Sequence, residues 1–459
     1  MMTYIRRRGL GFRVGAAGGA GGGATIRRGA GIPIRRTWFL IFLFCLLSFI
    51  LIQYMVSLPP PVYKSPTVIS SCSSKKVTSL DDHPYILQED TVCSTTCGGQ
   101  CFPRVRDLCI SHDTVTVCKG GAQILPSSLR FSGKDQYWRR NVAIKSGICA
   151  YSRENEQSMA EALWIRGTQL VGDMKMMPNG HKVGPSPHHE AEKLIPAILL
   201  SRFYGFNGSS FYWFTDPVPA EVTSVWSMGL MKAFRDELDV KFSTVPESGG
   251  KAICFEDAVL FSGVTNAGYV PNTKSNDWLR EKVLSHCNIK KMERSKRVQN
   301  VVIINRLNSS REIGNSDEVE GVLERELGVP VKRVTNGVGD FCQQVRVVAE
   351  GDVFVTPHGS HNVNFLFARP GGLVLEAFPL LYYLDWFRNY VHSARLDYHE
   401  LFGTWPIEQQ GGMPLRMSLY GLLFGWKNCF STRQCMNYAK GQNVYVDLHQ
   451  LKRLLGRYL

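Results

Sequence analysis

Two stretches decide the fold: RVQNVVIINR at residues 297–306 and DVFVTPHGSHNVNFLFARPGGLVLEAF at residues 352–378. Each contains short runs of β-branched and aliphatic residues without polar alternation, which is typical of strands buried on both faces. VKRVTN at residues 331–336 has the pattern of a further strand between them. The region therefore contains four short strands separated by segments long enough to hold helices.

The intervening segments carry helix signals. Asn315 or Ser316 can cap a helix that ends near Gly328, and Asp340 can cap another that stops at Gly351. Strands that alternate with helices predict a parallel sheet covered on both faces, so the fold class is α/β.

Ligands of open parallel sheets bind at the carboxyl ends of the strands. The loops expected at that edge span residues 305–312, 335–340, 356–362 and 377–383. They contain a concentration of polar and basic side chains: Asn305, Arg306, Arg311, Thr335, Thr356, His358, Ser360 and His361. We therefore expect a polar ligand at this edge.

The loop at 356–362 leads into a helix N-terminus, where free backbone N–H groups favour an anion such as a diphosphate. Gly359 lets the backbone approach the ligand closely, and Arg306 and Arg311 can pair with phosphate oxygens. The alternative for each arginine is a surface ion pair, and for His358 a packing role within the loop. The chain contains no Asp-x-Asp metal signal, which predicts a site without metal or cofactor.

The net charge of +14 is unevenly distributed. Residues 1–37 contain eight arginines and no acid, which leaves about +6 for the other 422 residues. That balance suits a small anionic ligand and does not indicate nucleic-acid binding. At 459 residues the chain is long enough for two globular units plus extensions.

Residues 38–56, WFLIFLFCLLSFILIQYMV, form an uncharged run long enough to cross a bilayer. The arginines precede it, so the positive-inside rule predicts a single-pass type II anchor with residues 1–37 in the cytoplasm. A cleaved signal peptide is disfavoured because SLPPPVY follows, and a mitochondrial presequence does not explain the apolar run. We expect a Golgi membrane protein with its main part in the lumen, the endoplasmic reticulum being the alternative.

Cysteine usage agrees with a lumenal location. Twelve of the thirteen cysteines follow the predicted anchor, and six fall within 47 residues, which indicates disulfides rather than a zinc ribbon. Residues 57–120 are therefore expected to form a Cys-rich stem. Cys429 and Cys435 are close enough to close a short loop, and Asn207 and Asn308 are candidate glycan acceptors.

The motifs NRLNSSREIGNSDEV, FCQQV and DVFVTPHGSHNVNFLFARPGGLVLEAFP together resemble glycosyltransferase family 61. Its members include xylosyl-, arabinosyl- and O-linked N-acetylglucosaminyltransferases. The positions that match are Arg306, Arg311, Ile313, Asn315, Asp352, His358, Gly359, Asn364, Phe365, Pro370, Gly372, Glu376 and Pro379. The chain departs from the family's A-G-L-T-N with Ser360-His-Asn-Val-Asn, and His361 replaces a glycine.

The resemblance implies a GT-B-like architecture, with two Rossmann-like domains facing a cleft. It also implies inverting transfer of xylose, arabinose or N-acetylglucosamine from a UDP-sugar to a glycan or glycoprotein. The predicted donor-binding residues are Asn305, Arg306, Arg311, Thr356, His358, Gly359, Ser360, His361, Asn364 and Glu376. The altered loop motivates one alternative, a catalytically silent relative that binds glycan or nucleotide as a complex partner.

A catalytic base is expected in the N-terminal domain. GPSPHHEAEKLIPAILLSRF supplies four candidates near the start of a helix: His188, His189, Glu190 and Glu192. Two alignments with the family's H-E-F-N-D are open, one through His188 and Glu192 and the other through His189 and Glu190. A zinc-protease motif is excluded because Lys193 stands at its second histidine, and the alternative role is a solvated helix start.

Beyond the stem, the chain is expected to divide into three parts. Residues 121–295 form the acceptor-side domain, 296–400 the nucleotide-sugar-binding domain, and 401–459 a segment that packs back on the domains. The last residues, VDLHQLKRLLGRYL, have the pattern of an amphipathic helix.

Overall fold

The structure is a computed structural model that describes residues 85–89 and, with gaps, residues 100–458. The gaps are 112–113, 119–142, 148–161, 174–185, 205–209, 216–223, 245–249, 262–269, 271, 291–294, 296, 338, 405–428 and 430–432. The predicted tail, the predicted anchor at 38–56 and Asn207 lie outside the described residues. Within the described part, no helix has the length and apolar character needed to cross a bilayer.

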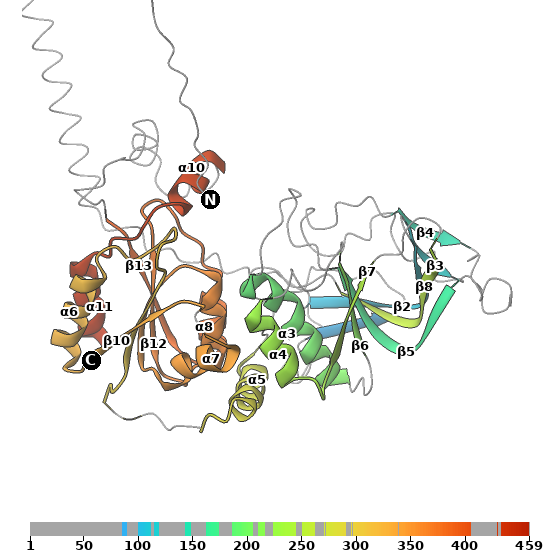
Figure 1. Cartoon of the computed structure of the whole chain (residues 1–459), viewed down its shortest axis with the longest axis horizontal. Coiled ribbons are helices and arrows are strands. Elements are labelled where there is room, and N and C mark those ends of the chain that lie inside the picture. Colours follow the sequence, from blue (N-terminus) through green and yellow to red (C-terminus); the bar gives the residue numbers. More distant parts are fainter. Residues whose placement is uncertain are drawn as a thin grey trace, which may run out of the picture. The chain divides into compact units, whose positions relative to one another are not determined.

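The C-terminal half contains a five-stranded sheet in which every neighbouring pair is parallel (Figure 1). Its strands are β9 (Val301–Asn305), β10 (Val331–Thr335), β11 (Val353–Pro357), β12 (Leu373–Phe378) and β13 (Asp397–Phe402). Their order is β10-β9-β11-β12-β13. The four predicted strands are confirmed, and β13 extends the sheet beyond them.

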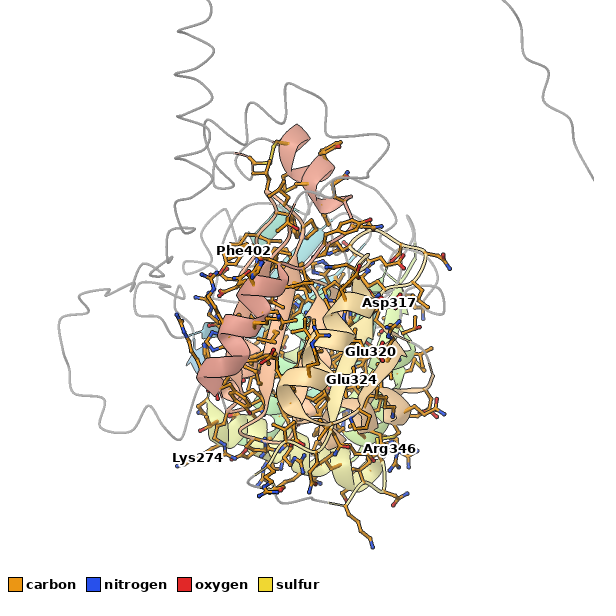
Figure 2. The ribbon with its side chains drawn as sticks, turned by 90° about the vertical axis from the view of Figure 1, so that its left-hand side faces the viewer. Lys274, Asp317, Glu320, Glu324, Arg346 and Phe402 are labelled. Atoms are coloured by element: carbon orange, nitrogen blue, oxygen red, sulfur yellow. A yellow bond between two sulfur atoms is a disulfide. The ribbon has the colours of Figure 1, made fainter. Side chains whose placement is uncertain are left out.

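One face of this sheet is covered by α6 (Ser316–Leu327) and α11 (Leu448–Tyr458), which share a core with β9, β11 and β12. Helix α6 ends at Gly328, which has φ 69°, as the sequence predicted. The acidic side chains Asp317, Glu320 and Glu324 lie along α6 in Figure 2. Leu451 and Leu455 are the buried residues of α11, which confirms the predicted amphipathic helix.

The other face packs against a second, larger core. Helices from both halves of the chain contribute to it: α3 (Pro187–Tyr204), α4 (Val225–Ala233), α5 (Thr273–His286), α7 (Phe341–Glu350), the 3₁₀ helix η4 (Ser360–Phe367) and α8 (Arg388–Ser393). Helix α3 is buried along almost its whole length, as expected of a helix without a continuous polar face. The upstream helices are thus fixed against the C-terminal sheet.

The N-terminal half contains an eight-stranded mixed sheet. Its strands are β1 (Tyr85–Glu89), β2 (Gln100–Ile110), β3 (Thr114–Cys118), β4 (Ala143–Gly147), β5 (Ala162–Asp173), β6 (Ser210–Thr215), β7 (Asp239–Thr244) and β8 (Ala252–Phe261). Strands β5 to β8 pair in parallel with one another, whereas β2 pairs antiparallel with β3 and β8.

Part of the predicted Cys-rich stem belongs to this sheet. Residues 85–118, which lie within the expected 57–120 stem, supply β1, β2 and β3. A disulfide joins Cys109 of β2 to Cys254 of β8, 145 residues later. The cysteines of this region therefore do not all pair locally, because β2 lies beside β8 in the sheet.

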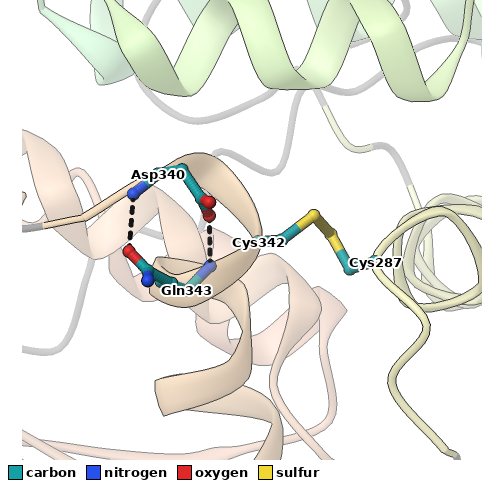
Figure 3. Close-up of a disulfide and its surroundings, with 4 residues drawn as sticks. All are labelled: Cys287, Asp340, Cys342 and Gln343. Atoms are coloured by element: carbon teal, nitrogen blue, oxygen red, sulfur yellow. Dashed lines mark hydrogen bonds between the residues drawn. A yellow bond between two sulfur atoms is a disulfide. The ribbon is translucent and has the colours of Figure 1, made fainter.

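Helix α7 is fixed at its N-terminus in two ways (Figure 3). Asp340 accepts a hydrogen bond from the Gln343 backbone N–H, and the Gln343 side chain accepts one from the Asp340 N–H. This capping box confirms the predicted N-cap. In the same turn a disulfide joins Cys342 to Cys287, the residue that caps the end of α5.

Candidate functional site

The strand order places a topological switch point between β9 and β11. After β9 the chain moves outward to β10, and then returns across β9 to β11 on its other side. The connections leave the two central strands in opposite directions, which opens a crevice at their carboxyl ends. Arg306 follows β9 and His358 follows β11, so the predicted ligand edge coincides with the switch point.

The segment after β9 is a closed loop that ends at Ile313, and Asn305 closes it. The carboxamide oxygen of Asn305 accepts hydrogen bonds from the N–H groups of Arg306 and Ile313, and its Nδ2 donates to the Ile313 carbonyl. Asn305 is buried, and all these bonds go to the backbone. It therefore positions the two arginines by holding their loop.

A short C-terminal segment, residues 442–446, braces the same loop, and we call it the strap. Gln442 and Val444 carbonyls accept from the N–H groups of Arg311 and Gly314, and Val444 N–H donates to the Glu312 carbonyl. Asn315 is the N-cap residue of α6, but its carboxamide bonds to the backbone of Val446 in both directions. The strap thus fixes the loop's geometry.

Three cations meet at this loop, and we call Arg306, Arg311 and Lys440 the cationic cluster. Burial and repulsion from Arg311 lower the pKa of Arg306 to about 10. Burial lowers the pKa of Arg311 too, although Tyr382 and Glu376 act in the opposite direction. Burial and both arginines lower the pKa of Lys440. Among the described residues none of the three forms a salt bridge with an acid, although the charge of Glu376 acts on Arg311 at longer range.

Lys440 was not predicted from the sequence. It ends helix α10 (Arg433–Lys440), in the segment expected only to pack back on the domains. Tyr382 is a second such residue: burial raises its pKa to about 12. Its hydroxyl therefore keeps its proton and can donate a hydrogen bond to an anion beside the two arginines.

Gly359 allows the β11 loop to approach the cluster. A Cβ at this position would lie 2.9 Å from Nη1 of Arg306 and 2.8 Å from Nδ1 of His361. Its φ of −177° is extended, so glycine is required here for space and not for a left-handed backbone. Arg311 Nη1 also donates to the carbonyl of His358, at 3.0 Å.

Glu376 on β12 is completely buried, and its hydrogen bonds hold the β11 loop in place. Its Oε1 accepts from Nδ1 of His358 and from Nδ2 of Asn362, both at 2.8 Å. Its Oε2 accepts from the Tyr398 hydroxyl of β13. Because Nδ1 of His358 donates to the carboxylate, its Nε2 is the ring's acceptor. Burial lowers the pKa of His358, with Glu376 opposing.

His361, which stands where the family has glycine, is also held on both sides. The Asn336 carboxamide Nδ2 donates to its Nδ1 at 2.9 Å, and its Nε2 donates to the Thr356 hydroxyl at 2.8 Å. Burial, followed by the charges of Arg306 and Arg311, lowers its pKa well below the usual value. The backbone at His361 does not have a positive φ, so the loop accommodates a side chain there without left-handed strain.

The other predicted donor residues have distinct positions. Asn364 accepts from the Trp226 indole of α4 at 2.8 Å and lies 3.4 Å from the Gln344 amide, so it joins η4 to the upstream helices. Ser360 begins η4 and is partly exposed. Thr356 is buried between His361 and Asn362.

The upstream candidates lie in the first two turns of α3, where their surroundings differ. Glu190 is fully buried, and its carboxylate accepts from the Ser224 N–H and from the hydroxyls of Ser224 and Ser227. Burial raises its pKa in spite of these bonds. It holds the N-terminus of α4. His189 is less buried, and its Nδ1 lies 3.2 Å from Glu192 Oε2.

The structure brings this helix start close to the β11 loop. The rings of Trp386 and Phe387 each contact both His188 and His358, with centroid distances of 4.9 to 6.4 Å. His188 also bonds through Nδ1 to the Tyr390 hydroxyl. The start of α3 and the β11 loop, about 170 residues apart in sequence, therefore face the same two aromatic rings. Their proximity could not be predicted from the sequence.

Metal ligation is confined to one group of side chains in the described part of the chain. Ligand atoms of His188, His189 and Glu192 all lie within 4.8 Å of one another. The carboxylate of Glu376, whose charge acts on Arg311, accepts three hydrogen bonds from protein donors.

The family profile described as Glycosyltransferase 61 matches residues 141–375 of this sequence. The match covers more than half of the chain, so the protein belongs to the glycosyltransferase 61 family. It contains the β9 and β11 loops and the start of α3, and membership places the chain in the glycosyltransferase class, which uses nucleotide-sugar donors and glycan acceptors.

No curated protein matches the chain. Among solved structures, a shikimate 5-dehydrogenase from Mycobacterium fortuitum is 11% identical over 64% of this chain and 98% of that one, with a TM-score of 0.14. A similarity at this TM-score indicates nothing about the fold or the function of this chain.

Proposed function

We propose that the protein is an inverting glycosyltransferase that transfers xylose, arabinose or N-acetylglucosamine from a UDP-sugar to a glycan or glycoprotein. The observation that carries this proposal is the cationic cluster. Arg306 and Arg311 lie partly buried at the switch point of a parallel sheet beside the more exposed Lys440, and none of the three has an acidic partner among the described residues. A diphosphate supplies the negative charge that such a site lacks.

The proposed chemistry is a single displacement. The acceptor hydroxyl attacks the anomeric carbon as the bond to the UDP oxygen breaks, so the product has inverted configuration. The cationic cluster stabilises the negative charge that develops on the leaving UDP, and the Tyr382 hydroxyl can donate to the same group. Charge stabilisation by side chains alone predicts activity without a metal ion.

His189 is the base that the geometry favours. With Nδ1–H donating to Glu192 at 3.2 Å, its Nε2 is available to remove the proton of the acceptor hydroxyl. His188 is more deeply buried and bonds to Tyr390, and Glu190 holds α4, so both are better suited to positioning. Glu192 orients the His189 ring. The contacts through Trp386 and Phe387 support a GT-B-like arrangement with acceptor and donor sides facing each other.

The proposed location is the Golgi membrane, with residues 38–56 as a type II anchor and the folded part in the lumen. Two observations support it. The arginines of residues 1–37 lie entirely before the apolar run. The described residues contain the disulfides Cys109–Cys254, Cys287–Cys342 and Cys429–Cys435, which persist in an oxidising compartment.

The test uses the full chain produced in a secretory host. UDP-xylose, UDP-arabinose and UDP-N-acetylglucosamine are supplied with mixed glycan acceptors, and released UDP is measured with and without EDTA. We expect turnover with one donor that survives the chelator. UDP binding without turnover would instead identify the catalytically silent relative, and loss of turnover in EDTA would contradict the metal-independent mechanism.

Substitution of the cluster gives a second test. Arg306→Ala should weaken UDP binding by about tenfold to a hundredfold, because it removes a charge-assisted contact. Arg333→Ala is the matched control, since Arg333 lies on the neighbouring strand β10 and pairs with Asp317 and Glu320 on α6. Equal UDP affinities for the two variants would show that Arg306 does not contribute to UDP binding.

A further inference from the structure

A cavity of about 140 Å³ lies at the amino edge of the C-terminal sheet. Its lining includes Arg369 and Pro370, which precede β12, and Arg395, which precedes β13. Helix α5 contributes Arg280 and Leu284 to the same lining. The loops predicted to bind the sugar donor follow the carboxyl ends of the strands, so this cavity is separate from the candidate donor site.

The charged side chains that line the cavity are mostly basic. Four are basic and two are acidic: Arg280, Lys290, Arg369, Arg395, Asp277 and Glu281. Asp352 pairs with Arg369 at 2.5 Å and offsets one of the positive charges. A single oxygen, Oδ1 of Asp277, accepts hydrogen bonds from both Arg280 and Arg395. One carboxylate therefore serves two guanidinium groups.

Arg280 lines this cavity and carries a donor group without an acceptor. Its side chain is only 5% exposed, and its Nη2 donates to Asp277. Its Nη1 is buried and has no hydrogen-bond partner among the described residues. A buried N–H without an acceptor is destabilising, and a guanidinium group cannot lose its proton to avoid that cost. An acceptor inside the cavity would satisfy this donor.

The backbone at Arg395 shows that the fold itself does not require an arginine there. Helix α8 ends in a Schellman motif, in which the Arg395 N–H donates to the His392 carbonyl and the next N–H donates to the Val391 carbonyl. Arg395 occupies the left-handed position of this motif, with φ 59°. Glycine is the usual residue at that position, because a side chain there has a conformational cost.

The guanidinium groups of this cavity are oriented before any ligand binds. Asp277 holds Arg280 and Arg395, the second at 2.7 Å, and Asp352 holds Arg369. Donors that are already fixed lose little conformational entropy when a ligand binds. Arginine donors also match the geometry of phosphate oxygens.

We propose that this cavity binds a tetrahedral oxyanion, phosphate or sulfate, either free or as the end group of a sugar ester. One oxygen accepts from Nη1 of Arg280, and the others face Arg395 and Lys290. A water molecule could accept the same hydrogen bond, but it would not balance the excess of basic groups. The bound anion connects α5 to the turn before β13 and so holds an upstream helix on the C-terminal sheet. The proposal does not depend on the proposed transferase activity.

The test measures binding of phosphate, sulfate and glucose 6-phosphate by isothermal titration calorimetry, with chloride at the same ionic strength as the reference. The full chain carries Arg306→Ala, which weakens anion binding at the cationic cluster. We expect phosphate or its ester to bind with a dissociation constant of about 1 mM or lower. Binding should also raise the thermal unfolding temperature.

Two further substitutions in this protein locate the anion. Arg395→Gly removes one guanidinium group and places glycine where the backbone favours it, so the fold is retained. Arg280→Met removes the buried donor and keeps most of the side-chain volume. Each should weaken binding at least about tenfold and reduce the rise in unfolding temperature. Arg333→Met is the matched control, because Arg333 is held by Asp317 and Glu320 on α6 and should leave both readouts unchanged.

The outcomes also distinguish the two sources of the anion. Binding of inorganic phosphate or sulfate identifies a free anion as the ligand, whereas binding of glucose 6-phosphate alone identifies an ester. If none of the three binds at concentrations up to about 10 mM, or if Arg395→Gly binds as tightly as Arg333→Met, the proposal is wrong. If Arg280→Met does not fold, the comparison with Arg395→Gly decides.

Discussion

At the scale of single residues, Glu376 shows how a buried charge is retained in this site. Three donors, His358 and Asn362 of the β11 loop and Tyr398 of β13, converge on its two oxygens. A fully buried carboxylate requires such compensation, because removal from water is otherwise costly. The same bonds fix which nitrogen of His358 donates.

Two substitutions of Glu376 distinguish its role as a hydrogen-bond acceptor from the space that its side chain fills. Glu376→Met leaves three buried donors without an acceptor and should lower the free energy of unfolding by roughly 3 kcal/mol or more. Glu376→Gln should cost only about 1 kcal/mol, because its amide can accept at Oε1 and donate to the Tyr398 oxygen. Urea unfolding of both variants measures the difference, and equal losses would contradict this hydrogen-bond assignment.

His361 should make stability depend on pH. Its pKa is lowered in the folded state, whereas in the unfolded chain it is about 6.5. Below that pH the unfolded state binds the proton first, so the stabilisation is complete above about pH 6.5 and is lost as the pH falls toward the lowered native pKa. The wild type should therefore lose more stability between pH 7.5 and 5.5 than His361→Asn.

Chemical denaturation at both pH values measures this difference. Glu190, whose raised pKa acts in the opposite direction, is common to both proteins, so the comparison isolates His361. Parallel pH profiles for the two proteins would show that His361 is not held neutral by the fold.

The sequence predicted some of these residues and missed others for identifiable reasons. Arg306, Arg311 and His358 could be found because each follows a strand whose pattern is legible. Lys440 and Tyr398 could not. Lys440 ends the short helix α10, and Tyr398 lies on a fifth strand whose sequence, DYHELF, has no buried run. The arrangement of three donors around Glu376 could not be predicted, because it depends on the order of the strands in the sheet. Local sequence patterns do not specify that order.

At the scale of elements, the helix ends were the most predictable features. Asp340 and Gly328 act as expected because capping depends on local chemistry. Asn315 was predicted as an N-cap and occupies that position, but its side chain bonds to Val446 instead. A partner 131 residues away competes with the local bond, and no local signal could indicate it.

The Cys287–Cys342 disulfide should contribute more to stability than Cys429–Cys435. The first closes a separation of 55 residues and the second only 6. Loop-closure entropy predicts losses of about 4 and about 2 kcal/mol when each pair is replaced by serine. Thermal unfolding of the two double variants measures them.

Loss of Cys287–Cys342 should also weaken UDP binding, because α7 contacts η4, the helix that follows the β11 loop, through Gln344 and Asn364. This second readout distinguishes a local effect from general destabilisation. If both double variants lower the unfolding temperature equally and leave UDP affinity unchanged, the disulfide does not organise the site.

At the scale of the whole molecule, the contact between α4 and α7 connects the upstream helices to the C-terminal sheet. A Cβ on Gly229 would lie 2.1 Å from Cβ of Phe341, and Trp226 bonds to Asn364 in the same region. The sequence could not predict that both halves share a core, because each half was interpreted from its own periodicity.

Gly229→Ala tests this contact. The added methyl group has no space, so we expect a loss of about 1 to 3 kcal/mol in the free energy of unfolding. Gly456→Ala is the matched control in α11, where a Cβ would meet no atom within 4 Å, and it should stabilise by about 0.5 to 1 kcal/mol. Changes of the same sign, measured by denaturant unfolding, would contradict the close packing of α4 on α7.

The strap at 442–446 has a consequence for how the protein is made. Every strand of the C-terminal sheet is synthesised before residue 403, yet the loop that carries Arg306 and Arg311 finds its hydrogen-bond partners only in the last twentieth of the chain. A ribosome can therefore complete the strands of the sheet before the residues that hold this loop have been synthesised. Translation that stops before Val444 would leave Glu312 and Gly314 without their backbone hydrogen-bond partner.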